Sequence, residues 1–256
     1  MAKYAFRDEQ RKEIIYSSEA VKEDRNTAFY CPNTDCNAQL YICAIDGSKA
    51  AYFRATKPQH PHIPNCLYGT RSIEFDENQF DESRFDYDKA MESLFGLTDT
   101  AIASNKSGEH SIGEPQKHPP RTIRQMYSMC KSLPVKSKYG NKEIGEMLLD
   151  DRSEYRYPKG CFGNRIIEAT VKKRFYDSEK KQIYLTAPVT SKKYSFVLDF
   201  SDNDTYKFIR NEIFNNSDKI IIVGGKWKPT DKYNYFISSV NGRKQVAIIK
   251  CFGSLT

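Results

Sequence analysis

The sequence predicts an α+β protein with a small cysteine-containing module at the N-terminus, a helical middle and a small β-barrel at the C-terminus. Three observations predict this arrangement. Cysteines and a histidine flank a short apolar stretch within the first third of the chain. Apolar residues recur at helical spacing in the middle of the chain, after a polar segment. From Arg165 onward, short stretches alternate apolar and polar residues, as half-buried strands do.

Composition favours a soluble, cytoplasmic protein without a membrane partner. The 256 residues are enough for two ordinary domains, and charged residues make up 29% of the chain. No apolar run approaches the ~18 residues that a membrane span needs, and the start of the chain lacks the apolar segment of a secretion signal. Seven cysteines form no paired framework, so we expect a reducing compartment. Abundant Lys, Asn, Ile and Tyr favour an AT-rich genome, either bacterial or of a phage.

Two pairs of metal-ligand residues lie near the N-terminus. Cys31 and Cys36 form the first pair, and His62 and Cys66 form the second. Two close pairs of Cys or His residues are typical of tetrahedral zinc sites. Three thiolates and one imidazole make a closed site, which is structural because a catalytic zinc keeps an open position. The sequence therefore predicts Zn²⁺ as a structural cofactor.

A β-hairpin is predicted between the two ligand pairs. Residues 40–44 and 51–54 read as strands around the turn Asp46-Gly47-Ser48, and another short strand is predicted at 14–16. Prolines around the second pair prevent a helix there. Ligand pairs flanking a hairpin are the layout of a zinc ribbon, so we interpret residues 1–103 as a zinc-ribbon-like domain with an acidic helical extension.

Three alternatives stay open at this module. His60 is either the ligand in place of His62 or a group that supports the ligand. Cys43 is either a buried strand residue or a replacement ligand. The cysteines as a whole are either metal ligands or ordinary free thiols.

The middle of the chain contains an acidic stretch, a linker and two predicted helices. Residues 74–92 are acidic with aromatic residues at roughly helical spacing, which indicates a solvated helix or a protein-binding stretch. Residues 104–120 are polar and non-periodic, and we interpret them as a linker. Residues 121–160 are predicted as a helical connector, with one helix from Thr122 to about Leu133 and another at 142–150.

Residues 161–256 are interpreted as one β-barrel domain. Strands are predicted at 165–172, 183–186, 194–200, 219–223 and 233–239, with a suggested sixth at 245–249. A helix at 205–215 separates the third strand from the fourth, and Gly224-Gly225 allows a bend. The order of three strands, one helix and two strands resembles the oligonucleotide/oligosaccharide-binding (OB) fold, a partly open five-stranded barrel.

The predicted ligand-binding part of this barrel is basic and aromatic. OB domains bind across strands two and three, beside the loops that join strands one and two and strands four and five. Proteins bind single-stranded nucleic acid with cations, which contact the phosphates, and with aromatic rings, which stack on the bases. Trp227, the single tryptophan, either stacks on a base or closes the end of the barrel. The predicted nucleic-acid-binding residues are Lys172, Arg174, Lys180, Lys181, Tyr184, Lys226, Trp227, Lys228, Lys232 and Tyr233.

The excess positive charge lies in the same part of the chain. Residues 164–250 contain 17 Lys and Arg against 9 Asp and Glu, whereas the remainder contains 23 against 24. A local basic field is typical of a phosphate-binding surface. A lysine-rich genome would produce a similar excess without any function.

Residues 4–70 resemble the N-terminal segment of the competence protein CoiA family. The residues that carry the resemblance are Tyr30-Cys31-Pro32 with Cys36, Tyr52-Phe53-Arg54, and His62 with Cys66. The chain departs from that pattern by extra residues between Cys31 and Cys36, and by Arg54 and its following loop, where the family tends to have further histidine. The family continues into a nuclease-like domain that has no convincing counterpart here. The resemblance implies a DNA-handling context.

No P-loop, dinucleotide-binding glycine pattern or nucleophile elbow is present, and no catalytic residue is predicted. We interpret the chain as a non-enzymatic protein that binds single-stranded DNA, with RNA left open. One alternative is a divergent nuclease or a nuclease accessory subunit. The other is an adaptor that docks a protein through the zinc module or through residues 74–92.

Overall fold

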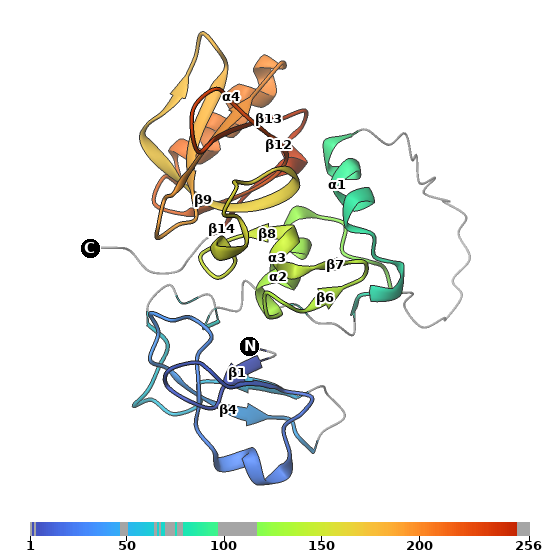
Figure 1. Ribbon diagram of the computed structural model, residues 1–256, viewed down its shortest axis with the longest axis vertical. Helices are drawn as coiled ribbons and strands as arrows, with labels where there is room; N and C mark the ends of the chain where they lie inside the picture. The colour runs from blue at the N-terminus through green and yellow to red at the C-terminus, as the bar shows by residue number, and fades with distance from the viewer. Residues whose placement is uncertain are drawn as a thin grey trace. The chain divides into compact units, whose positions relative to one another are not determined.

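A computed structural model describes residues 2, 4–46, 51–63, 66, 68–69, 75, 79–96 and 117–249 (Figure 1). The chain divides into two compact units. The first comprises Met1–Phe75 with Ser128–Pro134 and Ile249–Thr256, and the second comprises Asp76–Tyr127 with Val135–Ile248. Within the described ranges, none of the helices combines the length and hydropathy that crossing a membrane requires.

The first unit is built on a five-stranded antiparallel sheet. Its strand order is β2-β1-β3-β4-β5. The hairpin predicted between the ligand pairs is confirmed, because β4 and β5 pair antiparallel with Ile42 opposite Phe53. Its predicted turn lies largely outside the described residues, which resume at position 51. The strand predicted at 14–16 is also confirmed. The elements are β1 (Tyr4–Phe6), β2 (Ile14–Tyr16), the 3-10 helix η1 (Lys22–Asn26), β3 (Phe29–Tyr30), β4 (Gln39–Cys43) and β5 (Tyr52–Arg54).

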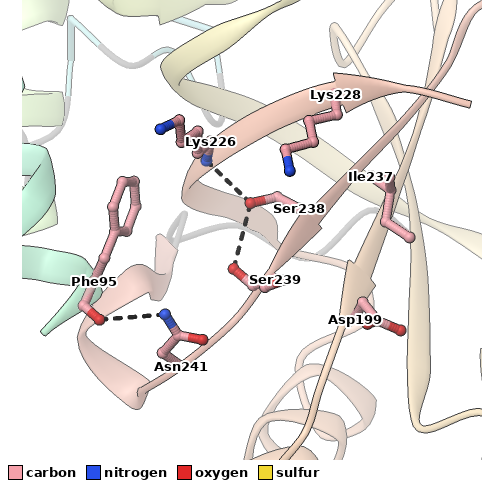
Figure 2. Close-up of a pocket in the computed structure, with 8 residues that line it drawn as sticks. All are labelled: Phe95, Asp199, Lys226, Lys228, Ile237, Ser238, Ser239 and Asn241. Atoms are coloured by element: carbon pink, nitrogen blue, oxygen red, sulfur yellow. Dashed lines mark hydrogen bonds between the residues drawn. The ribbon is translucent and has the colours of Figure 1, made fainter. Parts of the chain in front are cut away.

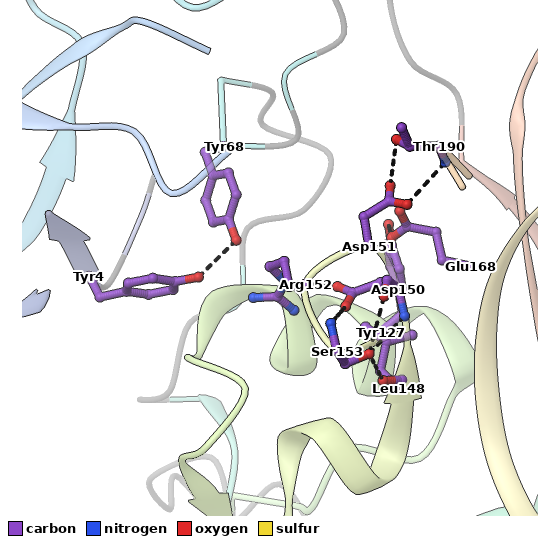
Figure 3. A network of polar contacts seen from close by, with 10 residues as sticks. All are labelled: Tyr4, Tyr68, Tyr127, Leu148, Asp150, Asp151, Arg152, Ser153, Glu168 and Thr190. Atoms are coloured by element: carbon purple, nitrogen blue, oxygen red, sulfur yellow. Dashed lines mark hydrogen bonds and ion pairs between the residues drawn. The ribbon is translucent and has the colours of Figure 1, made fainter. Parts of the chain in front are cut away.

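The described part of the hydrophobic core of the first unit includes the cysteines Cys31, Cys36 and Cys66. Phe29 and Phe53 meet edge to face with ring centroids 5.0 Å apart. The hydroxyls of Tyr4 and Tyr68 lie 3.0 Å apart, at hydrogen-bond distance (Figure 3).

The second unit contains a closed five-stranded β-barrel. The strands follow the order β9-β10-β11-β13-β12, and β12 pairs with β9 to close the ring. All pairs are antiparallel except β11 with β13, which is parallel. This arrangement is compatible with an OB-like barrel. The elements are β9 (Gly163–Asp177), β10 (Gln182–Ala187), β11 (Tyr194–Asp199), α4 (Asn203–Phe214), β12 (Ile220–Pro229) and β13 (Tyr235–Ser239).

The long strand β9 pairs with both β10 and β12 and thereby closes the barrel. Its first half pairs with β12, where Ala169 lies opposite Ile221, and its second half pairs with β10. Between the pairs Val171 with Leu185 and Tyr176 with Ile183 the register shifts. Such a bulge bends and twists a strand, which is what the closing of a small barrel requires.

The barrel interior follows the period-two pattern of the sequence. Ile167, Leu185, Phe196 and Trp227 point into one buried cluster, to which α4 contributes Tyr206, Ile209 and Ile213. The helix predicted at 205–215 is present as α4 and begins at an N-cap, because the Asp202 carboxylate accepts a 2.7 Å hydrogen bond from the Thr205 backbone N–H.

The helical middle is described only in part. The first predicted helix is present as α2 (Ile123–Ser132). In place of the second, the chain forms β7 (Lys142–Glu143), the one-turn helix α3 (Ile144–Met147) and β8 (Leu148–Leu149). The prediction of a helix over 142–150 was therefore wrong, because Leu148 and Leu149 pair in parallel with Ile166 and Ile167 of β9. The apolar spacing of this segment serves a strand rather than a helix face.

The acidic stretch forms its helix later than its spacing suggests. The 3-10 helix η4 covers Glu82–Arg84, and α1 covers Tyr87–Phe95 with Asp86 as its N-cap. Residues 74, 76–78 and 104–116, which include part of the acidic stretch and most of the predicted linker, lie outside the described residues. The remaining elements are β6 (Lys138–Tyr139), η5 (Glu154–Arg156), η6 (Arg243–Gln245) and β14 (Val246–Ile249), the last at the place of the suggested sixth strand.

Buried polar groups accompany β8 and β9 in the second unit (Figure 3). The Tyr127 hydroxyl donates a 2.6 Å hydrogen bond to Glu168, and the Arg152 guanidinium lies 2.7 Å from Asp150. Burial, followed by the charge of Glu168, raises the pKa of Tyr127. These carboxylates are buried with partners, as buried charges must be.

Candidate metal centre and barrel surface

Three cysteines and one histidine converge in the first unit. Cys31 directly follows β3, and Cys36 lies shortly before β4. His62 and Cys66 follow β5. The hairpin therefore carries the second pair back to the first. The four ligand atoms all lie within 4.8 Å of one another, and the three cysteines are buried.

The distances within this cluster leave room for a cation at its centre. The Cys31 and Cys66 sulfurs are 3.6 Å apart, and His62 Nδ1 lies 3.6 Å from the Cys31 sulfur and 3.5 Å from the Cys36 sulfur. A disulfide would need a separation of about 2.05 Å, so the thiols are free. Cys31, Cys36, His62 and Cys66 can thus hold a metal ion.

The structure decides between the two histidines. His62 is half-buried with Nδ1 directed at two cysteines, whereas His60 is exposed and outside the cluster. The backbone carbonyl of His60 accepts from the Gln39 N–H at 3.3 Å, and its backbone N–H donates to the Lys57 carbonyl at 3.3 Å. Cys43 is also outside the cluster, since its thiol donates to the Tyr41 carbonyl at 3.6 Å within β4.

Hydrogen bonds within the cluster shift the pKa values of Cys31, Cys36 and His62. The hydrogen bond with Cys36 raises the pKa of Cys31, and the same bond lowers the pKa of Cys36. Burial lowers the pKa of His62, but hydrogen bonds with Cys36 and Cys66 outweigh it and raise the pKa to about 9. Metal ligands must be deprotonated, so a cation that binds here displaces the protons of these hydrogen bonds.

Arg11, which belongs to no motif of the sequence, holds the loop between the first two ligands. Its guanidinium donates to the carbonyls of Cys31, Asn33 and Cys36 at 3.0, 3.2 and 2.8 Å. In addition, the Asn33 backbone N–H donates to the Cys31 sulfur at 3.5 Å. Two strands and a 3-10 helix separate Arg11 from Cys31 along the chain, so no local pattern in the sequence connects the two.

Substitution of Arg11 by alanine is expected to weaken metal binding by about 10–100-fold, the usual effect of losing a group that orients ligands. Three carbonyls that shape the ligand loop would lose their donor. Competition with a chromophoric chelator measures the metal affinity of the full chain. Lys12→Ala is the matched control, because the Lys12 side chain is exposed and one position away. Equal affinities for both variants would contradict this role of Arg11.

The predicted nucleic-acid-binding residues fall into three groups by exposure. Arg174, Lys180, Lys226, Lys228, Lys232 and Tyr233 are exposed, with Tyr233 at 88%. Lys172, Lys181 and Tyr184 are half-buried. Trp227 is buried at 2%.

Trp227 is a core residue of the barrel. Its indole N–H donates to the Arg165 carbonyl at 3.1 Å, and its ring meets Phe196 edge to face at 4.7 Å. The burial leaves no ring face on which a base could stack, so the stacking alternative is corrected in favour of the core alternative. The flanking lysines point outward because neighbouring residues of a strand alternate between its two faces.

Tyr184 and Lys228 lie on the outer face of the barrel, whereas Lys180, Lys181, Lys232 and Tyr233 lie in the loops between strands. Across neighbouring strands, Tyr184 lies opposite Val197, Val197 opposite Ile237, and Ile237 opposite Lys228. The Lys172 ammonium donates to the Ser195 hydroxyl at 2.8 Å and lies 4.7 Å from the centre of the Tyr235 ring.

Tyr235 lies on the same outer face, although it is not among the predicted binding residues. The hydrogen bond with Ser195, together with the charge of Lys172, lowers the pKa of its hydroxyl. Its ring is half-buried, and the Lys232 ammonium lies 5.7 Å from the ring centre. Tyr235 occupies the predicted fifth strand, so its outward parity was readable from the sequence.

A pocket of about 300 Å³ opens on the same outer face, beside the end of α1 (Figure 2). Its lining residues from the barrel strands are Asp199, Lys226, Lys228, Ile237, Ser238 and Ser239, and Phe95 and Asn241 complete it. Hydrogen bonds hold its wall: the Lys226 backbone N–H donates to the Ser238 hydroxyl at 3.0 Å, and the Asn241 amide donates to the Phe95 carbonyl at 3.4 Å.

Comparisons of the chain with models of protein families, with curated proteins and with solved structures find no match. The two features that bear on function are therefore the Cys and His cluster of the first unit and the outer face of the barrel.

Proposed function

We propose that the protein binds single-stranded DNA on the outer face of its barrel, without catalysing a reaction, and that a zinc ion stabilises its first unit. One observation carries the proposal: exposed cations lie on the outer face and in the loops of a closed barrel, and an exposed aromatic ring lies in one of these loops. Cations neutralise phosphates, and aromatic rings stack on unpaired bases. With Trp227 assigned to the core, the stacking role passes to Tyr233, Tyr184 and Tyr235.

The metal proposed for the cysteine cluster is zinc. Zn–S and Zn–N bonds of about 2.3 and 2.0–2.1 Å, at tetrahedral angles, separate two sulfurs by about 3.8 Å and a sulfur from a nitrogen by about 3.6 Å. The observed separations of 3.6 Å between sulfurs and 3.5–3.6 Å from sulfur to nitrogen fit these values. Four protein ligands leave no open position, so the zinc would be structural.

The layout of the first unit supports a zinc-ribbon-like interpretation. The hairpin of β4 and β5 lies between the two ligand pairs, as in a zinc ribbon. The resemblance of residues 4–70 to the CoiA family adds a DNA-handling context to the proposal. The choice of DNA over RNA rests on that resemblance alone.

Binding is expected to be strongest for single-stranded DNA and to fall steeply with salt. Replacement of Arg174, Lys180, Lys181 and Lys232 by alanine should weaken it and should flatten the slope of log K against log salt by about 0.7 for each phosphate that is no longer neutralised. Fluorescence anisotropy of the full chain with labelled single-stranded DNA, double-stranded DNA and single-stranded RNA measures these affinities.

The matched control removes four exposed cations elsewhere, Lys12, Lys117, Lys136 and Lys159. This variant has the same net charge as the first but should keep the wild-type affinity. Equal losses in both variants would mean that binding depends on overall charge and would overturn the proposed surface. Absence of single-strand binding by the wild-type chain would overturn the proposed function.

A further inference from the structure

The pocket beside α1 combines groups from three neighbouring barrel strands. β13 lies between β12 and β11. Lys228 on β12 is opposite Ile237 on β13, and Asp199 on β11 is opposite Ser239 on β13. An ammonium group and a carboxylate therefore reach the pocket from opposite sides of β13, with Ile237 between them (Figure 2).

The charged groups of this pocket can still form hydrogen bonds or ion pairs with a ligand. In the part of the chain that the structure describes, neither Lys226 nor Lys228 has an ion-pair partner. Asp199 accepts one hydrogen bond through Oδ1, from the Gln182 amide at 2.9 Å. No described residue donates to its Oδ2, so this oxygen can accept from a ligand.

The mixture of groups defines the chemistry of the ligand. A phosphate would be attracted by the lysines but repelled by Asp199. A purely apolar ligand would bury these charges without partners, which is costly. A flat heterocycle with donors and acceptors on one edge suits the lysines, the carboxylate and the apolar Ile237 and Phe95 together. The volume of about 300 Å³ lies at the small end of the ~300–1,000 Å³ typical of small-molecule sites.

We propose that this pocket binds a guanine base of the single strand, an inference that rests on the proposed function. Guanine is the only common base with two adjacent N–H donors beside a carbonyl acceptor on its pairing edge. N1–H and the N2 amino group would donate to the Asp199 carboxylate, and O6 would accept from the Lys228 ammonium. Lysine is a known partner of guanine oxygens, and carboxylates accept from base amino groups. The pocket thus gives the barrel a base preference.

The preference is tested at a single group of the base. The full chain is titrated with labelled thymidine oligonucleotides that carry one central guanine, hypoxanthine, adenine or cytosine. Hypoxanthine is guanine without its N2 amino group, and we expect its oligonucleotide to bind about tenfold more weakly or worse. Asp199→Asn should bind the two equally. Lys228 is exposed, so Lys228→Gln should leave the fold intact. It should lower the affinity for the guanine oligonucleotide more than for the plain thymidine strand.

Asp204→Asn is the matched control, since Asp204 is an exposed carboxylate on α4 outside the pocket, and it should keep the full preference for guanine. Thermal unfolding of each variant verifies its folded state. Wild-type binding of all four oligonucleotides with equal affinity would overturn the guanine pocket and leave the proposed function intact.

Failure of the wild-type chain to bind any oligonucleotide would instead overturn the proposed function. The pocket is then tested by itself with guanosine and adenosine monophosphates, followed by NMR chemical shifts at Asp199 and Lys228. Shifts with the guanosine nucleotide alone would support the pocket, and shifts with both or neither would overturn it.

Discussion

Replacement of Cys36 by serine is expected to remove tightly bound zinc and to unfold the first unit. The hydroxyl of serine is a poor zinc ligand, and three remaining ligands cannot close the site. Binding of structural zinc releases about 10–16 kcal/mol in small modules, and this energy is also folding energy. The described core of the first unit cannot replace it, since Cys31, Cys36 and Cys66 are themselves a substantial part of that core.

Elemental analysis of the purified full chain measures the zinc content, and NMR reports the amide signals of residues 4–69. Wild-type protein should contain one zinc per chain and lose the dispersed signals of the first unit on chelation. Cys43→Ser is the matched control, because Cys43 lies nearby on β4 but outside the cluster. A Cys36→Ser chain with dispersed first-unit signals and no zinc would contradict a metal-dependent fold.

Replacement of Trp227 by alanine is expected to lower the free energy of unfolding of the barrel by about 3–5 kcal/mol, as for other large core residues. The indole is 2% exposed, contacts Phe196 and donates to the Arg165 carbonyl. Its removal leaves a cavity and takes one hydrogen-bond donor away from the Arg165 carbonyl, where β12 meets β9. Urea unfolding, followed by the far-UV signal of the full chain, measures the change.

Lys226→Ala and Lys228→Ala serve as neighbours in the same strand. Both side chains are exposed, so each substitution should change the unfolding free energy by no more than about 0.5 kcal/mol. A Trp227→Ala change of that same small size would contradict the core assignment. Because Trp227 has no free face, the folded fraction of the variant should bind single strands with unchanged affinity.

Most of the barrel was predictable from alternation alone. The strands at 165–172, 183–186 and 194–200 stand out because every second residue is apolar, and the helix after them begins at a recognisable cap, Asp202. The hairpin of the first unit was predictable for the same reason. The four ligands were predictable because metal chemistry restricts their residue types and spacing.

Trp227 was wrongly included among the binding residues because the end of the fourth strand was predicted too early. We expected the fourth strand to end at Val223, with a bend at Gly224-Gly225, whereas β12 continues to Pro229. Once the strand is continued, Trp227 has the same parity as Ile221 and Val223 and must face inward. The inward-facing Trp227 also explains the glycine at position 225, because a Cβ there would lie 2.8 Å from the Trp227 ring.

Other features depend on contacts between residues that are distant in the sequence. The second middle helix is reduced to the single turn of α3 because Leu148 and Leu149 pair with β9, a strand that begins only at Gly163. Arg11 binds a loop that begins at Cys31, beyond β2, η1 and β3. The pocket joins the end of α1 to β11, β12 and β13, which follow it only after many other elements. Local propensity contains no information about any of these pairings.

The pairing of β9 with β12 also determines when the barrel can close during synthesis on the ribosome. Ala169 meets Ile221 in this pair, so β9 must leave the ribosome and wait for β10, β11 and α4 to be synthesised before its partner strand exists. During synthesis, the first half of β9 is an unpaired edge with a buried, apolar character, and such edges associate readily with other chains. The four ligands of the first unit, in contrast, are all synthesised by Cys66. A nascent chain arrested before β12 should therefore have a zinc-loaded module and an aggregation-prone half-barrel.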